Sequence, residues 1–172
     1  MKTILSSIFI LISLFFTNSA SAQNQRIFLF ETGSVLTKGA NARINYVSKW
    51  DDSLSGEIGV LWFNNNLTDS IQGDLGINGR ISYKLDFLSI IPSIYVGLGT
   101  GVNLQNSSQN FMLFEYGVTA DYMYSRKIYL GLGFGGFTIT KSDVNSTDSN
   151  SLISSSSFLI NFRLTWITGE EW

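Results

Sequence analysis

The chain has 172 residues, a net charge of −2, thirteen Phe, seven Tyr, four Trp and sixteen Gly, and only 14% of its residues are charged. This length suits a single domain, and the lack of a basic excess argues against nucleic acid as a partner. Cysteine and histidine are both absent, which excludes a disulfide framework, thiol chemistry and any mechanism that uses a histidine base.

The N-terminus has the pattern of a secretory signal peptide. Lys2 precedes an apolar run over residues 4–16, and the segment ends in the small residues Ala-Ser-Ala at 20–22. The run of about 13 residues is shorter than the roughly 20 that a membrane-spanning helix needs. We therefore expect residues 1–22 to be cleaved, the protein to be exported, and residues 23–172 to form the mature domain.

The rest of the chain alternates apolar and polar residues in stretches that are separated by turn-forming residues. This alternation predicts eight strands, at residues 26–36, 41–50, 54–63, 71–85, 92–104, 111–124, 127–140 and 156–167. The connections after the second, fourth and sixth strands are short. Those after the third, fifth and seventh are polar, rich in Asn and Ser, and mostly longer. The pattern is typical of an all-β, eight-stranded antiparallel up-and-down barrel whose N-terminus lies at the end with the short turns.

Each predicted strand has one apolar face and one face of polar residues and Gly. The apolar faces include Ile77, Phe114 and Phe162. Nearly all the charge within strands lies on the opposite faces, at Glu31, Arg43, Glu57, Asp74, Arg80, Glu115, Asp121 and Arg163. An eight-stranded barrel has room for side chains and little else, and the aromatic-rich apolar faces are too bulky to fit inside. We therefore expect the apolar faces to meet lipid and the charged residues to pair in the lumen.

Aromatic residues near the strand ends predict the two membrane interfaces of such a barrel. The four even-numbered strands carry, at the short-turn end, Trp50, Tyr83, Tyr122 with Tyr124, and Trp166. The opposite end is less regular, with Trp62, Phe111, Phe134 or Phe137, and Phe158. The strands each have ten or more residues, which matches the roughly 9–11 needed to cross a bilayer at a tilt.

On these features the whole mature chain resembles the small eight-stranded outer-membrane barrels of Gram-negative bacteria, the OmpA/OmpX-like group. The resemblance rests on the signal peptide, the alternating strands, the aromatic girdles and the last strand, SSFLINFRLTW. It implies a monomer in the cell outer membrane, in contact with outer-membrane lipid. It also implies insertion by the barrel-assembly machinery, with Trp166 or Trp172 as the terminal aromatic signal.

Two motifs could suggest other chemistry. The Gly-rich stretches 97–101 and 131–136 resemble phosphate loops, but the strand alternation continues through them, so we expect these Gly residues to make room in the lumen. Residues 143–150 space Asp and Asn somewhat like a calcium loop, but they lack its Gly and its distal Glu. We expect no catalytic residues, no metal and no cofactor.

We therefore expect a non-enzymatic protein with a structural or surface-interaction role. The interaction would use the loops 64–70, 105–110 and 141–155 and an unidentified extracellular partner. One alternative is a narrow, porin-like pore through the charged lumen. Another is a soluble, lipocalin-like binder of apolar ligands, which would need the apolar faces to point inward. We expect the charged set to act as a polar plug that keeps the barrel closed, rather than as an ion path.

Overall fold

The computed structural model describes residues 26–35, 39–64, 73–85, 89–104, 109–143 and 153–169. It contains eight strands: β1 (Arg26–Val35), β2 (Gly39–Lys49), β3 (Leu54–Asn64), β4 (Asp74–Lys84), β5 (Ile90–Asn103), β6 (Gln109–Ser125), β7 (Ile128–Asp143) and β8 (Ile153–Thr168). The predicted signal peptide lies outside the described residues. Within them, no helix is long and apolar enough to cross a membrane.

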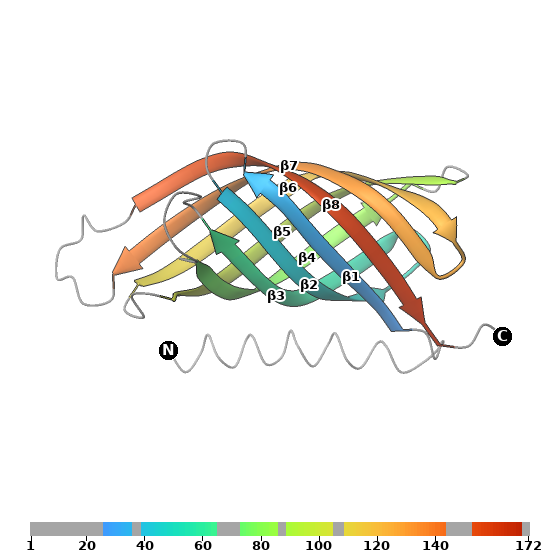
Figure 1. The fold of residues 1–172 in the computed structure, drawn as a ribbon, viewed down its shortest axis with the longest axis horizontal. Coiled ribbons are helices and arrows are strands. Elements are labelled where there is room, and N and C mark those ends of the chain that lie inside the picture. The colour runs from blue at the N-terminus through green and yellow to red at the C-terminus, as the bar shows by residue number, and fades with distance from the viewer. Residues whose placement is uncertain are drawn as a thin grey trace.

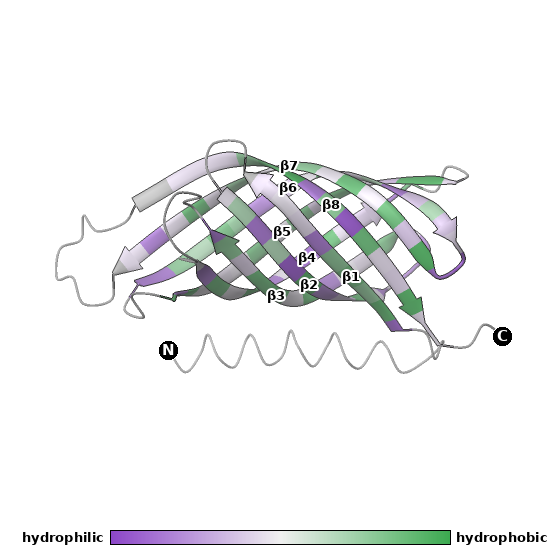
Figure 2. Cartoon of the chain, viewed as in Figure 1, coloured by the Kyte–Doolittle hydropathy of each residue, from purple (hydrophilic) through white to green (hydrophobic). Residues whose placement is uncertain are grey.

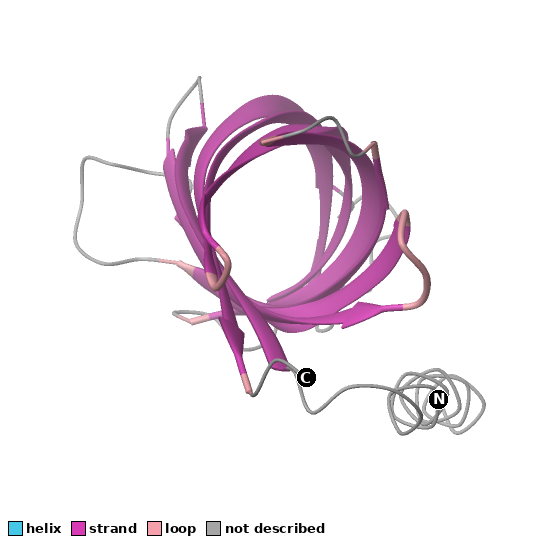
Figure 3. Ribbon diagram, turned by 90° about the vertical axis from the view of Figure 1, so that its right-hand side faces the viewer, coloured by secondary structure: helices cyan, strands magenta, loops and turns pink. Residues whose placement is uncertain are grey.

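The strands close into an antiparallel barrel in chain order, with β1 paired to both β2 and β8. Viewed from one end, the strands form a complete ring (Figure 3). If the register partners are followed from strand to strand, starting at Glu31 of β1, the line ends at Ile153 of β8. Glu31 also pairs directly with Arg163 of β8, which lies ten residues further along that strand. This stagger tilts the strands relative to the barrel axis, as closure of a barrel requires.

The two ends of the barrel differ in their connections. At one end, which we call the turn end, residues 50–53 join β2 to β3 and residues 126–127 join β6 to β7. Strand β1 begins there and β8 ends there (Figure 1). At the opposite end, the loop end, most residues of the predicted long connections lie outside the described residues. The prediction of eight antiparallel strands in a closed barrel is confirmed.

Some strand boundaries differ from the predicted ones. Strand β4 begins at Asp74 rather than at residue 71, and β7 and β8 extend further toward the loop end than expected. Pro92 is the third residue of β5 rather than its first. Its carbonyl accepts a hydrogen bond from the Leu85 N–H beyond the last β4–β5 register pair, Lys84 with Ser93. Proline has no N–H, so Pro92 returns no hydrogen bond to Leu85, at a position beyond the end of the β4–β5 ladder where this loss is tolerated.

Apolar and polar residues alternate along the strands (Figure 2). Because consecutive side chains of a strand point to opposite faces, the two sets lie on opposite sides of the wall. Ile77, Phe114 and Phe162 are 51%, 47% and 64% exposed, whereas Arg80 and Arg163 are only 2% and 7% exposed. The apolar faces therefore point outward and the charged faces point inward. This arrangement contradicts the soluble lipocalin-like alternative, which needs the reverse orientation.

The lumen also holds apolar side chains that the sequence analysis did not place there. One group, the loop-end cluster, comprises Leu61, Phe63, Phe111, Leu113, Phe137, Ile139 and Leu159. A second, the turn-end cluster, comprises Ile27, Leu29, Val47 and Ile167, with Tyr129 packed against it. Apart from Asp74, the buried charged residues lie between the two clusters along the strands, so the interior is layered rather than uniformly polar.

Candidate functional site

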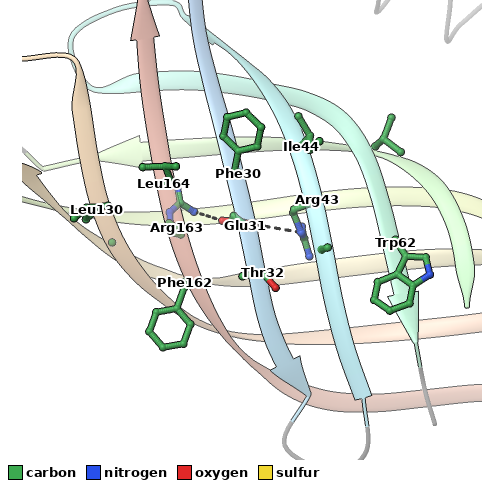
Figure 4. A pocket seen from close by; sticks show the side chains of 13 residues that line it. Phe30, Glu31, Thr32, Arg43, Ile44, Trp62, Leu130, Phe162, Arg163 and Leu164 are labelled. Atoms are coloured by element: carbon green, nitrogen blue, oxygen red, sulfur yellow. Dashed lines mark hydrogen bonds and ion pairs between the residues drawn. The ribbon is translucent and has the colours of Figure 1, made fainter. Parts of the chain in front are cut away.

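The centre of the lumen is occupied by a network of ion pairs that surrounds Glu31. This carboxylate of β1 accepts from Arg80 Nη1 at 2.8 Å and from Arg163 Nη1 at 2.5 Å, and it lies 3.2 Å from Arg43 Nε. The three arginines come from β4, β8 and β2, so a single carboxylate connects four strands. The pairs of Glu31 with Arg43 and with Arg163 are drawn in Figure 4.

Glu115 of β6 is the second centre of the network. Arg80 donates to it with Nε at 2.7 Å and with Nη2 at 3.0 Å, which is the two-pronged geometry that makes arginine–carboxylate pairs strong. Arg43 Nη1 donates to both of its oxygens at 2.9 Å. The Arg80 guanidinium also lies 4.4 Å from the centre of the Tyr95 ring on β5, a cation–π distance.

Glu57 and Asp121 lie at the edges of this network. Glu57 accepts hydrogen bonds from Asn45 and Ser82, both at 3.1 Å, and its nearest arginine atoms are 3.7 Å and 3.9 Å away. Asp121 accepts from Arg163 Nε at 3.1 Å. The network thus draws side chains from every strand except β7, whose Gly131 lies beneath the Asp121 carboxylate.

Asp74 does not belong to the central network. It lies at the loop end, where its carboxylate is 2.6 Å from Lys141 Nζ and accepts from Asn103 at 2.8 Å. The structure therefore places all eight predicted charged residues inside the barrel but brings only seven of them together. The eighth, Asp74, pairs with Lys141, which the sequence analysis had not placed among the charged residues of the lumen.

The central network is close to neutral, as burial of charge requires. It holds three arginines and four carboxylates, and Lys84 interacts electrostatically with Glu57 and Asp121 from the turn end. Each of the seven side chains is buried. Isolated charges would be very costly here, so these groups are stable only as a paired set.

The two apolar clusters were missed because the sequence analysis treated the inward faces as polar. Leu61 and Phe63 continue the face of Glu57 along β3, and Leu113 lies two residues from Glu115 on β6. Because side chains two residues apart in a strand lie on the same face, the positions of Glu57 and Glu115 could have revealed that these apolar residues point inward. Phe111 and Phe137, proposed as aromatics of the loop-end rim, are buried in the loop-end cluster instead. That part of the prediction was wrong, because both strands carry bulky residues on both faces.

The other aromatics that were predicted at the membrane interfaces lie near the strand ends. Trp50, Tyr83, Tyr122, Tyr124 and Trp166 are exposed, and all five lie close to the turn end. At the loop end, the rings of Phe134 and Phe158 stack with centroids 5.9 Å apart. Trp62 is half-buried, with its indole lying against Gly73.

Both Gly-rich stretches form strand throughout, as expected. Residues 97–101 lie in β5 and residues 131–136 in β7. Gly97 shows why such a residue is needed, since a Cβ there would lie 2.7 Å from Arg80 Cγ and 2.9 Å from Glu115 Oε1. The calcium-like stretch 143–150 lies outside the described residues except for Asp143.

The outer wall beside the network carries an apolar depression of about 740 Å³. Figure 4 shows Phe30, Trp62 and Phe162 projecting around it, while Glu31 and Arg163 project to the other side of the same strands. A single layer of backbone thus separates the ionic network from the apolar exterior. Within the described part of the chain, no group of three or more acidic side chains is arranged to hold a metal ion.

No family model and no curated protein sequence matches the chain. Among solved structures, it is similar to the N-terminal β-barrel domain of Pseudomonas aeruginosa OprF, with a TM-score of 0.61 and 8% identity over 85% of this chain and 98% of that one. It is also similar to the Neisserial surface protein A, with a TM-score of 0.51 and 12% identity over 83% and 94% of the two chains. A de novo designed transmembrane β-barrel matches with a TM-score of 0.51 and 16% identity over 86% and 98%. These similarities show that the chain has the fold of small outer-membrane barrels.

Proposed function

We propose that this protein is an integral outer-membrane barrel with a closed lumen and a non-enzymatic role, either structural or in surface interaction. The observation that carries the proposal is the orientation of the two faces, which is the reverse of that in a soluble barrel. Apolar side chains are exposed around the outside of the wall, and ion pairs are buried in the centre of the lumen. In water such a wall would be an unusually large exposed apolar surface. In a bilayer it is the surface that lipid requires.

Two further features support a membrane location. The exposed Trp and Tyr residues near the turn end resemble the aromatic girdle of membrane barrels. The fold is also that of outer-membrane barrels, including the OprF domain and the Neisserial protein. We infer that the signal peptide directs export and that the loop end faces the exterior, so that loops 64–70, 105–110 and 141–155 would meet an extracellular partner.

The non-enzymatic role rests on composition and on the site. The chain contains no histidine and no cysteine. A serine beside a carboxylate would lack the base that activates it as a nucleophile. Glu31 and Glu115, the central acidic groups of the network, are held in ion pairs within the lumen, away from solvent.

The closed lumen argues against the porin-like alternative. The central charged side chains are buried, and apolar clusters lie on both sides of them. A steady ion path would need water-filled space along the axis. We therefore expect purified protein in planar lipid bilayers to show no steady open channel. Frequent, uniform openings of pure protein would favour the pore.

The proposal is tested by cell fractionation combined with gel electrophoresis. The protein should remain in the outer-membrane fraction after washing without detergent. Unboiled and boiled samples should migrate differently, because an intact barrel resists the denaturing detergent until it is heated. Release with the soluble periplasmic contents would overturn the membrane assignment.

A further inference from the structure

The loop-end cluster spans the full width of the barrel. Phe63 on β3 and Phe137 on β7 are in edge-to-face contact, with ring centroids 5.1 Å apart. These strands are four apart in a ring of eight, so the two rings meet from opposite walls. Side chains that lined the wall without crossing the lumen could not make this contact.

The neighbouring strands complete the layer. The ring of Phe111 of β6 lies against β4 and β5, where a Cβ on Gly101 would be 2.6 Å from it and one on Gly76 would be 2.8 Å away. Leu113 lies beside Gly99 of β5.

On the side of β8, β1 and β2, Asn41 and Asn161 join through a 3.1 Å hydrogen bond across Gly33. Both amides are buried, and Asn41 lies in register with Phe63. Together with this amide pair, the loop-end cluster forms a layer that contacts all eight strands of the barrel.

The layer lies on the loop-end side of the central network of ion pairs. Along β3, Leu61 and Phe63 follow Glu57 toward the loop end. Along β6, Phe111 and Leu113 precede Glu115 on that same side, and along β8 Leu159 precedes Arg163 in the same way. The turn-end side differs, because the turn-end cluster comes from β1, β2 and β8, with Tyr129 of β7 packed against it. There β5 and β6 contribute the polar pair Ser93 and Thr119 instead.

Resting on the proposed function of a closed membrane barrel, we infer that the loop-end cluster is the element that seals the lumen from the loop side. In this inference the ion pairs hold the wall together but do not form the barrier. The physical reason is that a polar layer can be hydrated by small movements of its side chains. The seven apolar side chains of the loop-end cluster, packed across a narrow lumen, offer water and ions no polar partner and so exclude them.

Asn78 provides a reporter position between the two layers. It lies on β4 between Gly76, which Phe111 covers, and Arg80 of the ionic network. Its side chain is buried, and neither amide atom has a hydrogen-bond partner. Replacing it with cysteine therefore removes no hydrogen bond, and the chain has no other cysteine.

The experiment measures the rate at which a small, permanently charged methanethiosulfonate reagent modifies Asn78→Cys in the folded barrel, reconstituted in lipid vesicles and exposed to the reagent only on the side at which the loop end lies. Four backgrounds are compared: no other change, Phe63→Ala with Phe137→Ala, Asp121→Asn with Arg163→Gln, and Phe134→Ala with Phe158→Ala. The last pair removes two stacked phenyl rings from the outer wall and so matches the first pair in volume lost. Leu113→Ala is the milder variant if the double Phe63 and Phe137 change fails to fold.

We expect modification to be slow in the unchanged, Asp121/Arg163 and Phe134/Phe158 backgrounds, and at least about tenfold faster when the loop-end cluster is opened. Fast modification without any further change would overturn the inference. So would acceleration by the Asp121 and Arg163 changes without acceleration by the Phe63 and Phe137 changes. The gel shift of unboiled protein shows that each variant is folded. Failure of the membrane assignment would appear in fractionation and would leave these rates interpretable.

Discussion

Arg80 and Glu115 meet directly above Gly97. Arg80 of β4 and Glu115 of β6 are both in register with this glycine of β5, so their side chains approach over a residue that has none. Nε and Nη2 of the arginine then reach the two carboxylate oxygens at 2.7 Å and 3.0 Å. This two-pronged ion pair thus depends on a residue without a side chain in the strand between its members.

Gly97→Ala should therefore destabilise the barrel. The new methyl group would press on Arg80 and Glu115, and overpacking of this kind costs about 1–3 kcal/mol of the free energy of unfolding. The matched control is Gly79→Ala, where the nearest atom to an added Cβ is a backbone oxygen at 3.7 Å. Urea unfolding in lipid vesicles, followed by Trp fluorescence, measures both. Equal stability of the two variants would contradict the described packing.

Arg80→Met should cost more than Gly97→Ala. Arg80 pairs with Glu31 and Glu115 in the buried centre, and its removal leaves both carboxylates short of a partner. Breaking a buried ion pair from one side costs about 3–5 kcal/mol. Lys127→Met, at an exposed position in the turn between β6 and β7, is the control and should change little. The temperature at which the unboiled gel band converts to the unfolded one ranks the variants. The same conversion temperature for Arg80→Met and Lys127→Met would exclude a structural role for Arg80.

Charge on the outer wall should be tolerated according to depth. Leu98 lies near the middle of β5 and Ile90 at its turn end, and both are exposed on the outer face. In a membrane barrel, Arg costs about 2–4 kcal/mol at the bilayer midplane and about 0–1 kcal/mol near the interface. Leu98→Arg should therefore lower the free energy of unfolding in lipid vesicles much more than Ile90→Arg does. A soluble barrel would accept both changes equally well.

The alternation of Ile77, Asn78 and Arg80 was readable from the sequence because a strand has a strict period of two. Low charge and abundant aromatics then decided which face meets lipid. The partners of each charge were not readable, since they depend on the register and on the height of each residue in the barrel. Asp74 and Glu115 look alike in the sequence, yet one pairs with Lys141 at the loop end and the other with two arginines at the centre.

The loop-end cluster shows a second limit. Phe111 and Met112 are adjacent bulky residues, and alternation alone does not say which of them enters the lumen. The answer comes from β4 and β5, where Gly76 and Gly101 leave room for a ring. That room is visible only once the strands are aligned. The lumen of a small barrel is a packed core, and its composition reflects the space available as well as polarity.

The central claim is that the apolar faces contact hydrocarbon, and spin labelling along β5 tests it most directly. Single cysteines at Ile94, Tyr95, Val96 and Leu98 would each carry a nitroxide in protein reconstituted into lipid bilayers, with no native cysteine to interfere. Collision rates with oxygen, which concentrates in hydrocarbon, should be high at Ile94, Val96 and Leu98 and low at Tyr95, which points into the lumen. High collision rates with a water-soluble nickel chelate at Ile94, Val96 and Leu98 would contradict the account.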